Sequence, residues 1–124
     1  MMRFILTSIM ALGIVAMPTS KPEDLINTTW SGKINIPDPV DAEMEFRNDS
    51  LFTYVGADLV ETSSFKIKGD TLILQKINGM SSCDQQTADY KYTINEDVLR
   101  LEALNDNCAE RKSAFSNDGF KRLK

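Results

Sequence analysis

The chain has no histidine among its 124 residues. This absence removes the commonest general base, the partner that activates serine and cysteine nucleophiles, and the commonest zinc ligand. Carboxylates, tyrosines and lysines are still present, so the composition disfavours an enzyme without excluding one. We therefore expect a protein that is not an enzyme, with no catalytic residues, no metal and no cofactor.

Positive charge is also scarce, because 14 Lys and Arg stand against 18 Asp and Glu and leave a formal net charge of −4. No basic stripe offsets this balance, so neither nucleic acid nor an anionic membrane surface is an expected partner. The triplet Asn105-Asp106-Asn107 offers oxygen ligands but lacks a complete calcium-loop pattern. We interpret it as a solvated turn.

A hydrophobic run long enough to span a membrane is missing too. The longest one, Phe4 to Ala16, is too short for a transmembrane helix and follows Arg3 closely. It predicts a signal peptide over residues 1–16, followed by a linker over 17–24, and the alternative is a buried N-terminal helix. The mature protein is then expected in the periplasm or outside the cell, as a monomer with no membrane span.

Cysteine occurs only twice, at Cys83 and Cys108. Between them lie two alternating segments, 90–94 and 98–101, on either side of a turn at Asn95-Glu96-Asp97. Residues equidistant from the turn of an antiparallel hairpin lie opposite each other, so the two cysteines should meet at its open end. Because export provides an oxidising environment, we predict a structural disulfide.

The remainder of the chain is dominated by short segments with a period of two, which is typical of half-buried strands. They cover residues 27–36, 42–46, 51–55, 60–68, 71–76, 90–94, 98–101, 109–115 and 120–123. No long segment shows a helical apolar period. The pattern predicts one all-β domain over residues 25–124, an antiparallel meander of about eight strands closed into a small barrel.

The turns predict three hairpin registers. A three-residue loop at 48–50 sets Phe46 opposite Phe52 and Met44 opposite Tyr54, all inside the barrel. Gly69-Asp70 sets Ile67 opposite Leu72. The segment 92–101 echoes 65–74, so Glu96-Asp97 should set Tyr92 opposite Leu101, although pairing Tyr92 with Leu99 would keep the same faces.

Trp30 near the start of the first strand and Arg111 in a late segment resemble a pair found in lipocalin-like (calycin-type) proteins, especially compact domains of exported bacterial proteins. Thr28 stands where the Gly-x-Trp motif of that superfamily has glycine. The resemblance implies that Arg111 packs over Trp30 and closes one end of the barrel. A guanidinium over an indole contributes about 0.5–2 kcal/mol.

Six aromatic residues are predicted to point inward: Phe46, Phe52, Tyr54, Phe65, Tyr90 and Tyr92. They either fill the barrel or line a shallow pocket, in which Tyr54, Phe65, Tyr90 and Tyr92 would contact the ligand. Since the resemblance implies binding, we expect a module for a small apolar or amphipathic ligand. The alternative is a filled barrel that binds or inhibits a secreted or envelope protein.

Overall fold

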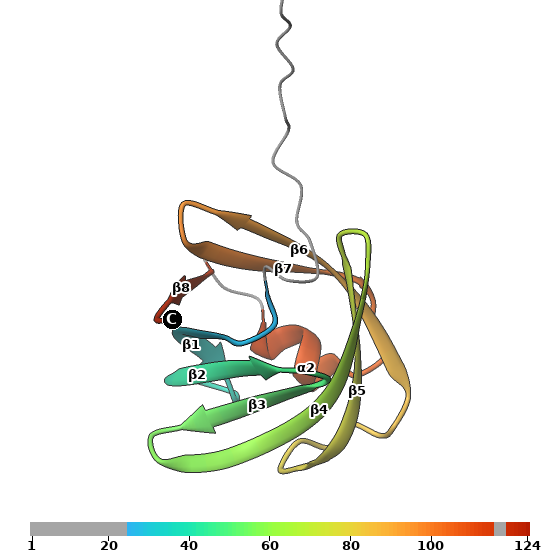
Figure 1. Ribbon diagram of the computed structural model, residues 1–124. Coiled ribbons are helices and arrows are strands. Elements are labelled where there is room, and N and C mark those ends of the chain that lie inside the picture. The colour runs from blue at the N-terminus through green and yellow to red at the C-terminus, as the bar shows by residue number, and fades with distance from the viewer. Residues whose placement is uncertain (1–24, 116–118) are drawn as a thin grey trace, which may run out of the picture.

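A computed structural model describes residues 25–115 and 119–124 (Figure 1). The predicted signal peptide at 1–16, the predicted linker at 17–24 and most of the turn expected at 117–119 lie outside the described residues. Within the described ranges, no helix has the length and apolar character needed to cross a membrane.

Eight antiparallel strands follow one another around a closed barrel, and β8 returns to pair with β1. The strands are β1 (Thr28–Asn35), β2 (Pro39–Arg47), β3 (Ser50–Val55), β4 (Asp58–Lys68), β5 (Thr71–Gly79), β6 (Thr87–Asn95), β7 (Val98–Asn105) and β8 (Phe120–Arg122). A short helix, α2 (Ala109–Ala114), lies between β7 and β8. The predicted all-β meander barrel is therefore confirmed.

Alternate residues along the strands fill most of the barrel, as the period of two predicts. The largest side chains that are less than 2% exposed are Trp30, Tyr90, Tyr92, Phe46, Phe120, Leu25, Met44, Leu72, Leu74 and Leu99. Neighbouring rings meet edge to face, with 5.2 Å between the centroids of Phe46 and Phe65. Aromatic packing therefore occupies the centre of the barrel.

Two of the three predicted hairpin registers are confirmed. Ile67 lies opposite Leu72 across the turn at Gly69, whose φ is 62°. Tyr92 lies opposite Leu101, so the alternative with Leu99 is not adopted. The two residues of this second turn, Glu96 and Asp97, both have positive φ, as a tight turn between twisted strands requires.

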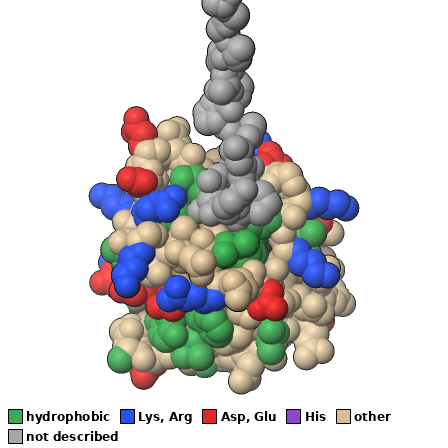
Figure 2. Space-filling view, in the orientation of Figure 1, with side chains coloured by type: hydrophobic (Ala, Val, Ile, Leu, Met, Phe, Trp, Pro, Cys, Tyr) green, Lys and Arg blue, Asp and Glu red, His purple; other side chains and the backbone are tan. Residues whose placement is uncertain are grey.

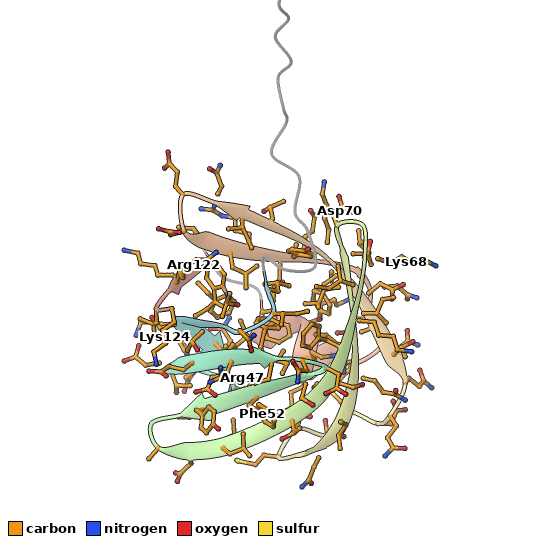
Figure 3. The ribbon with its side chains drawn as sticks, viewed as in Figure 1. Arg47, Phe52, Lys68, Asp70, Arg122 and Lys124 are labelled. Carbon is orange, nitrogen blue, oxygen red and sulfur yellow. A yellow bond between two sulfur atoms is a disulfide. The ribbon has the colours of Figure 1, made fainter. Side chains whose placement is uncertain are left out.

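The register predicted between β2 and β3 is wrong. The turn has two residues instead of three, so Phe46 lies opposite Leu51 and Met44 opposite Thr53. A shift of one residue moves every side chain of a strand to the other face. Leu51 and Thr53 are therefore buried, while Phe52 and Tyr54 are half-buried on the outer face. Phe52 is labelled in Figure 3.

The strand predicted over residues 109–115 is also wrong, because this segment contains helix α2. Its sequence, Ala-Glu-Arg-Lys-Ser-Ala, is rich in strong helix formers. Arg111 and Ala114, three residues apart, are the buried positions of the helix, as expected for one face of a helical turn. Glu110, in the first turn, is favourably placed with respect to the helix dipole.

Candidate functional site

The disulfide between Cys83 and Cys108 joins the loop after β5 to the residue that precedes α2. The Cα atoms are 5.4 Å apart, and the predicted pairing is confirmed. Beside it, the backbone N–H and the hydroxyl of Ser82 donate to Oε1 of Glu110 at 2.7 and 2.6 Å. These hydrogen bonds lower the pKa of the Glu110 carboxyl. Covalent and polar links thus hold α2 against this loop.

A buried polar network anchors the same helix from the inside. Nε and Nη2 of Arg111 donate to the two carboxylate oxygens of Asp106 at 2.8 and 2.9 Å. The Tyr90 hydroxyl also donates to Asp106, and so does the backbone N–H of Cys108, at 2.8 Å. The Arg111 side chain is 8% exposed and that of Asp106 is 0% exposed, so the ion pair is shielded from water.

The network shifts the pKa values of its members. Burial alone would raise the pKa of Asp106, but the hydrogen bonds from Arg111, Tyr90 and Cys108 together hold it below its usual value. For Tyr90, burial and the hydrogen bond to Asp106 raise the pKa of the phenol well above its usual range. Asp106 is therefore ionised and Tyr90 is neutral near pH 7.

A cavity of about 170 Å3 lies between α2 and the barrel interior. Its apolar lining includes Ile34, Leu51, Leu74 and Phe115, and its polar lining includes Thr53, Ser63 and Arg111. Ile36 and Met80 belong to the same lining and are 37% and 76% exposed, which places them at the rim. Strands β1, β3, β4 and β5 and helix α2 thus border a small, mostly apolar pocket that is partly open at the rim.

The sequence-predicted site residues lie elsewhere. Phe65, Tyr90 and Tyr92 are buried in the aromatic core, and Tyr54 lies on the outer face. None of these four is among the residues that line the cavity in the described part of the chain. Tyr90 is connected to the cavity through Asp106 and Arg111.

The guanidinium over Trp30 belongs to Arg122, 4.8 Å from the ring centroid, and not to Arg111. Trp30 and Arg122 are direct cross-strand partners of β1 and β8. Trp30 Nε1 also donates to the hydroxyl of Thr28 at 2.8 Å. Arg122 is also an arginine of a late strand, but it lies in the closing strand β8. The prediction had instead chosen Arg111, in the segment 109–115.

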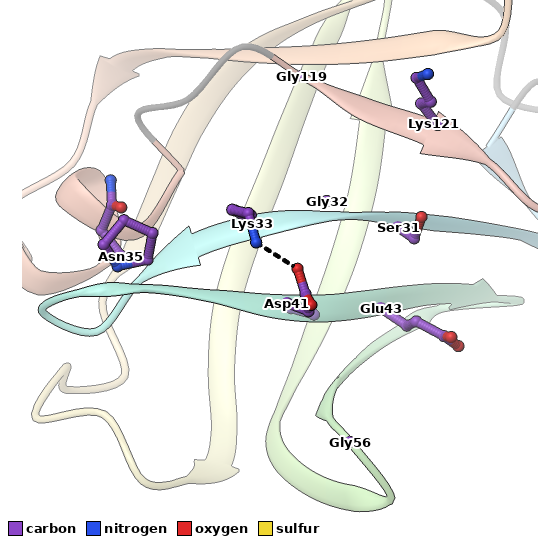
Figure 4. A pocket seen from close by; sticks show the side chains of 11 residues that line it. Ser31, Gly32, Lys33, Asn35, Asp41, Glu43, Gly56, Gly119 and Lys121 are labelled. Atoms are coloured by element: carbon purple, nitrogen blue, oxygen red, sulfur yellow. Dashed lines mark hydrogen bonds and ion pairs between the residues drawn. The ribbon is translucent and has the colours of Figure 1, made fainter.

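A larger hollow of about 790 Å3 lies on the outside of β1 and β2 (Figure 4). Charged side chains line it, among them Lys33 and Asp41, whose Nζ and Oδ1 atoms are 2.6 Å apart. Its lining is more polar than that of the cavity under α2 and it is more open to water, so it is less suited to an apolar ligand. The smaller, less open cavity under α2 is the better candidate for a binding site.

Asp106 is the member of the buried network that sequence reasoning missed, since its triplet is typical of a solvated turn. One signal was present, because Asp106 and Arg111 flank Cys108 at a short spacing. Because a disulfide at that cysteine ties the segment to the barrel, opposite charges on either side of it could pair where they are buried.

Comparisons with protein-family models, with curated proteins and with solved structures find no match for this chain. The function must therefore be argued from the geometry.

Proposed function

We propose that this protein is an exported, lipocalin-like binding module that takes a small apolar or amphipathic molecule into the cavity under α2. The proposal rests on this cavity, which lies between α2 and the interior of the closed barrel. Its walls are mostly apolar and include a few polar groups, as is typical of small-molecule sites. The disulfide between Cys83 and Cys108 fits an oxidising compartment such as the periplasm or the cell exterior.

The size of the cavity limits the ligand. A cavity of about 150 Å3 lined by Leu, Ile and Phe is known to bind benzene in a protein core, and the present one measures about 170 Å3. A molecule with one ring, or an aliphatic chain of similar volume, is therefore the expected occupant. A ligand with so few atoms has a net binding free energy of only a few kcal/mol once the cost of association is included. We therefore expect a Kd on the order of 0.1–1 mM.

A cavity-filling variant tests the proposal. Ala114 is 8% exposed and lines the cavity, so Ala114→Leu puts a larger side chain into the ligand's space. Ala109→Leu is the matched control, because Ala109 is exposed on the same helix. We expect acetophenone, titrated into labelled protein and followed by NMR, to bind the wild type and Ala109→Leu but not Ala114→Leu. Equal binding by all three proteins would contradict the proposed site.

A second candidate function, binding to another protein, is favoured by the outer face of β3 and β4. Phe52 and Tyr54 are half-buried there, and Leu59, the cross-strand partner of Tyr54, is 50% exposed. Figure 2 shows hydrophobic side chains gathered on the lower part of the visible face, where β3 and β4 run. Contiguous apolar surface of this kind is typical of protein interfaces.

Site-specific cross-linking distinguishes this second function. A photoreactive phenylalanine in place of Phe52 should give one dominant cross-linked partner in cells that export the protein. The same group in place of Thr93, exposed on β6, is the control. Indistinguishable cross-linking patterns from the two positions would argue against a docking face on β3 and β4.

A further inference from the structure

The guanidinium of Arg111 has one nitrogen that the buried network does not use. Nε and Nη2 face Asp106, and Nη1 therefore lies on the other side of the group. Nη1 is buried and has no hydrogen-bond partner among the described residues. Buried N–H groups almost always have an acceptor. Arg111 also lines the cavity under α2, so a ligand that packs against its guanidinium can supply the missing acceptor.

The charges around Arg111 indicate what kind of acceptor this is. Asp106 already balances the guanidinium with a bidentate ion pair. Two further carboxylates, Glu61 and Glu110, line the same cavity, and the whole chain has a net charge of −4. A carboxylate on the ligand would add a fourth negative charge to Asp106, Glu61 and Glu110, and the cations nearby are Arg111, which Asp106 already balances, and Lys76, which acts on Glu110. A neutral oxygen can accept from Nη1 without that repulsion.

The two glutamates themselves are already partnered. Ser81 donates to Glu61 through its backbone N–H at 3.2 Å and through its hydroxyl at 2.6 Å. Glu110 accepts from Ser82 in the same way. The unsatisfied group in the lining is thus a donor and not an acceptor, so the ligand has to bring an acceptor.

We infer that the ligand of this cavity is a small, uncharged molecule with an apolar body and one hydrogen-bond acceptor, such as a ketone, ester or amide carbonyl, and that Nη1 of Arg111 donates to it. This inference rests on the proposed small-molecule binding function and names the class of ligand. Arg111 then has two roles, since Nε and Nη2 hold the helix and Nη1 selects the ligand.

Three one-ring probes of similar shape test the inference: acetophenone carries a neutral acceptor, cumene carries none, and benzoate carries a charge. Their Kd values are measured by NMR titration on the wild type and on Arg111→Lys, because lysine has one nitrogen and Asp106 occupies it. Arg100→Lys, the same substitution at an exposed position of β7, is the control. The preference for acetophenone over cumene should fall about tenfold in Arg111→Lys and stay unchanged in Arg100→Lys.

The possible results separate the inference from the function on which it rests. If no probe binds the wild type at millimolar concentration, the proposed function fails. If acetophenone and cumene bind but Arg111→Lys leaves their ratio unchanged, the cavity is a binding site and Arg111 does not select the ligand. Benzoate as the tightest probe would also overturn the inference, in favour of an acidic ligand.

A second measurement applies if Arg111→Lys does not fold. The guanidinium protons of Arg111 are observed by NMR in the wild-type protein, where burial slows their exchange with water. Acetophenone should move the Nη1 proton resonance downfield, because a hydrogen bond forms there, whereas cumene should not. Equal shifts with both probes would show that no hydrogen bond to the carbonyl forms.

Discussion

Replacing Asp106 by asparagine removes the charge that neutralises Arg111 while keeping nearly the same shape. The Asp106 side chain is 0% exposed and accepts hydrogen bonds from Arg111, Tyr90 and the backbone of Cys108. In the Asp106→Asn variant the guanidinium remains buried with only one carbonyl oxygen to face it. The substitution therefore tests whether this network holds α2 in place.

The expected loss is large for a domain of this size. Breaking a buried ion pair by removing one partner costs about 3–5 kcal/mol. We expect about 3 kcal/mol, since the asparagine carbonyl still accepts one of the hydrogen bonds from Arg111. A domain of about 100 residues has a total stability of about 5–15 kcal/mol. The midpoint of thermal unfolding should accordingly fall by on the order of 15 °C.

Urea unfolding of Asp106→Asn and Asp41→Asn measures this difference. Asp41 forms a shorter ion pair, 2.6 Å from Lys33 Nζ, but its side chain is 89% exposed. Exposed pairs contribute about 0–1 kcal/mol, so Asp41→Asn should lower the free energy of unfolding by less than about 0.5 kcal/mol. If both variants lose the same amount, burial does not decide the strength of these pairs and the reasoning is refuted.

The same network predicts a pH dependence. The pKa of Asp106 is lower in the folded state than the value of about 3.9 expected in the unfolded chain. The unfolded chain therefore takes up the proton first as the pH falls, so this stabilisation is present above about pH 4 and is lost at lower pH. Asp106→Asn should lack this part of the acid-induced loss, whereas Asp41→Asn should keep it. Parallel stability curves for wild type and Asp106→Asn between pH 5 and 2 would contradict the assignment.

Three further changes test the fold. Leu51→Ala should lower the free energy of unfolding in urea by about 2–4 kcal/mol, because Leu51 lies in the core and is 2% exposed. Phe52→Ala should lower it by less than about 1.5 kcal/mol. The reverse order of losses would support the register first predicted. Replacing both Cys83 and Cys108 by serine removes a disulfide that spans 25 residues. The free energy of unfolding should fall by about 3 kcal/mol, and reductant should then cause no further loss of stability. Gly32→Ala places a Cβ 2.6 Å from a ring carbon of Phe120 and should cost about 1–3 kcal/mol, while unchanged stability would show that the ring moves freely.

Most of the barrel follows from local pattern. Alternation set the inward faces of β1, β2, β4 and β5, and the turn residues Gly69 and Glu96-Asp97 set two hairpin registers that the structure confirms. The cysteine pair followed from its symmetric placement about the second of these turns. These features depend on residues close together in the chain, so the sequence carries them directly.

The register of β2 and β3 depends on more distant residues. Both Leu51 with Thr53 and Phe52 with Tyr54 alternate correctly, so the period of two cannot choose between them. Phe65, from β4, already packs against Phe46 inside the barrel, and a leucine fits beside that pair. With the two-residue turn, Leu51 faces inward opposite Phe46 and Phe52 lies on the outer face.

The candidate site depends even more on tertiary structure. By itself, the sequence determined an all-β meander, its disulfide and the faces of most strands, because those are set by neighbours along the chain. Local helix propensity already favours a helix at residues 109–114, but only the folded barrel decided that Arg111 is buried against Asp106 and that Arg122 covers Trp30. A charge must be paired where it is buried, and the lining of a cavity consists of the residues around it. Both depend on which distant segments of the chain come into contact, and the local sequence pattern does not determine this.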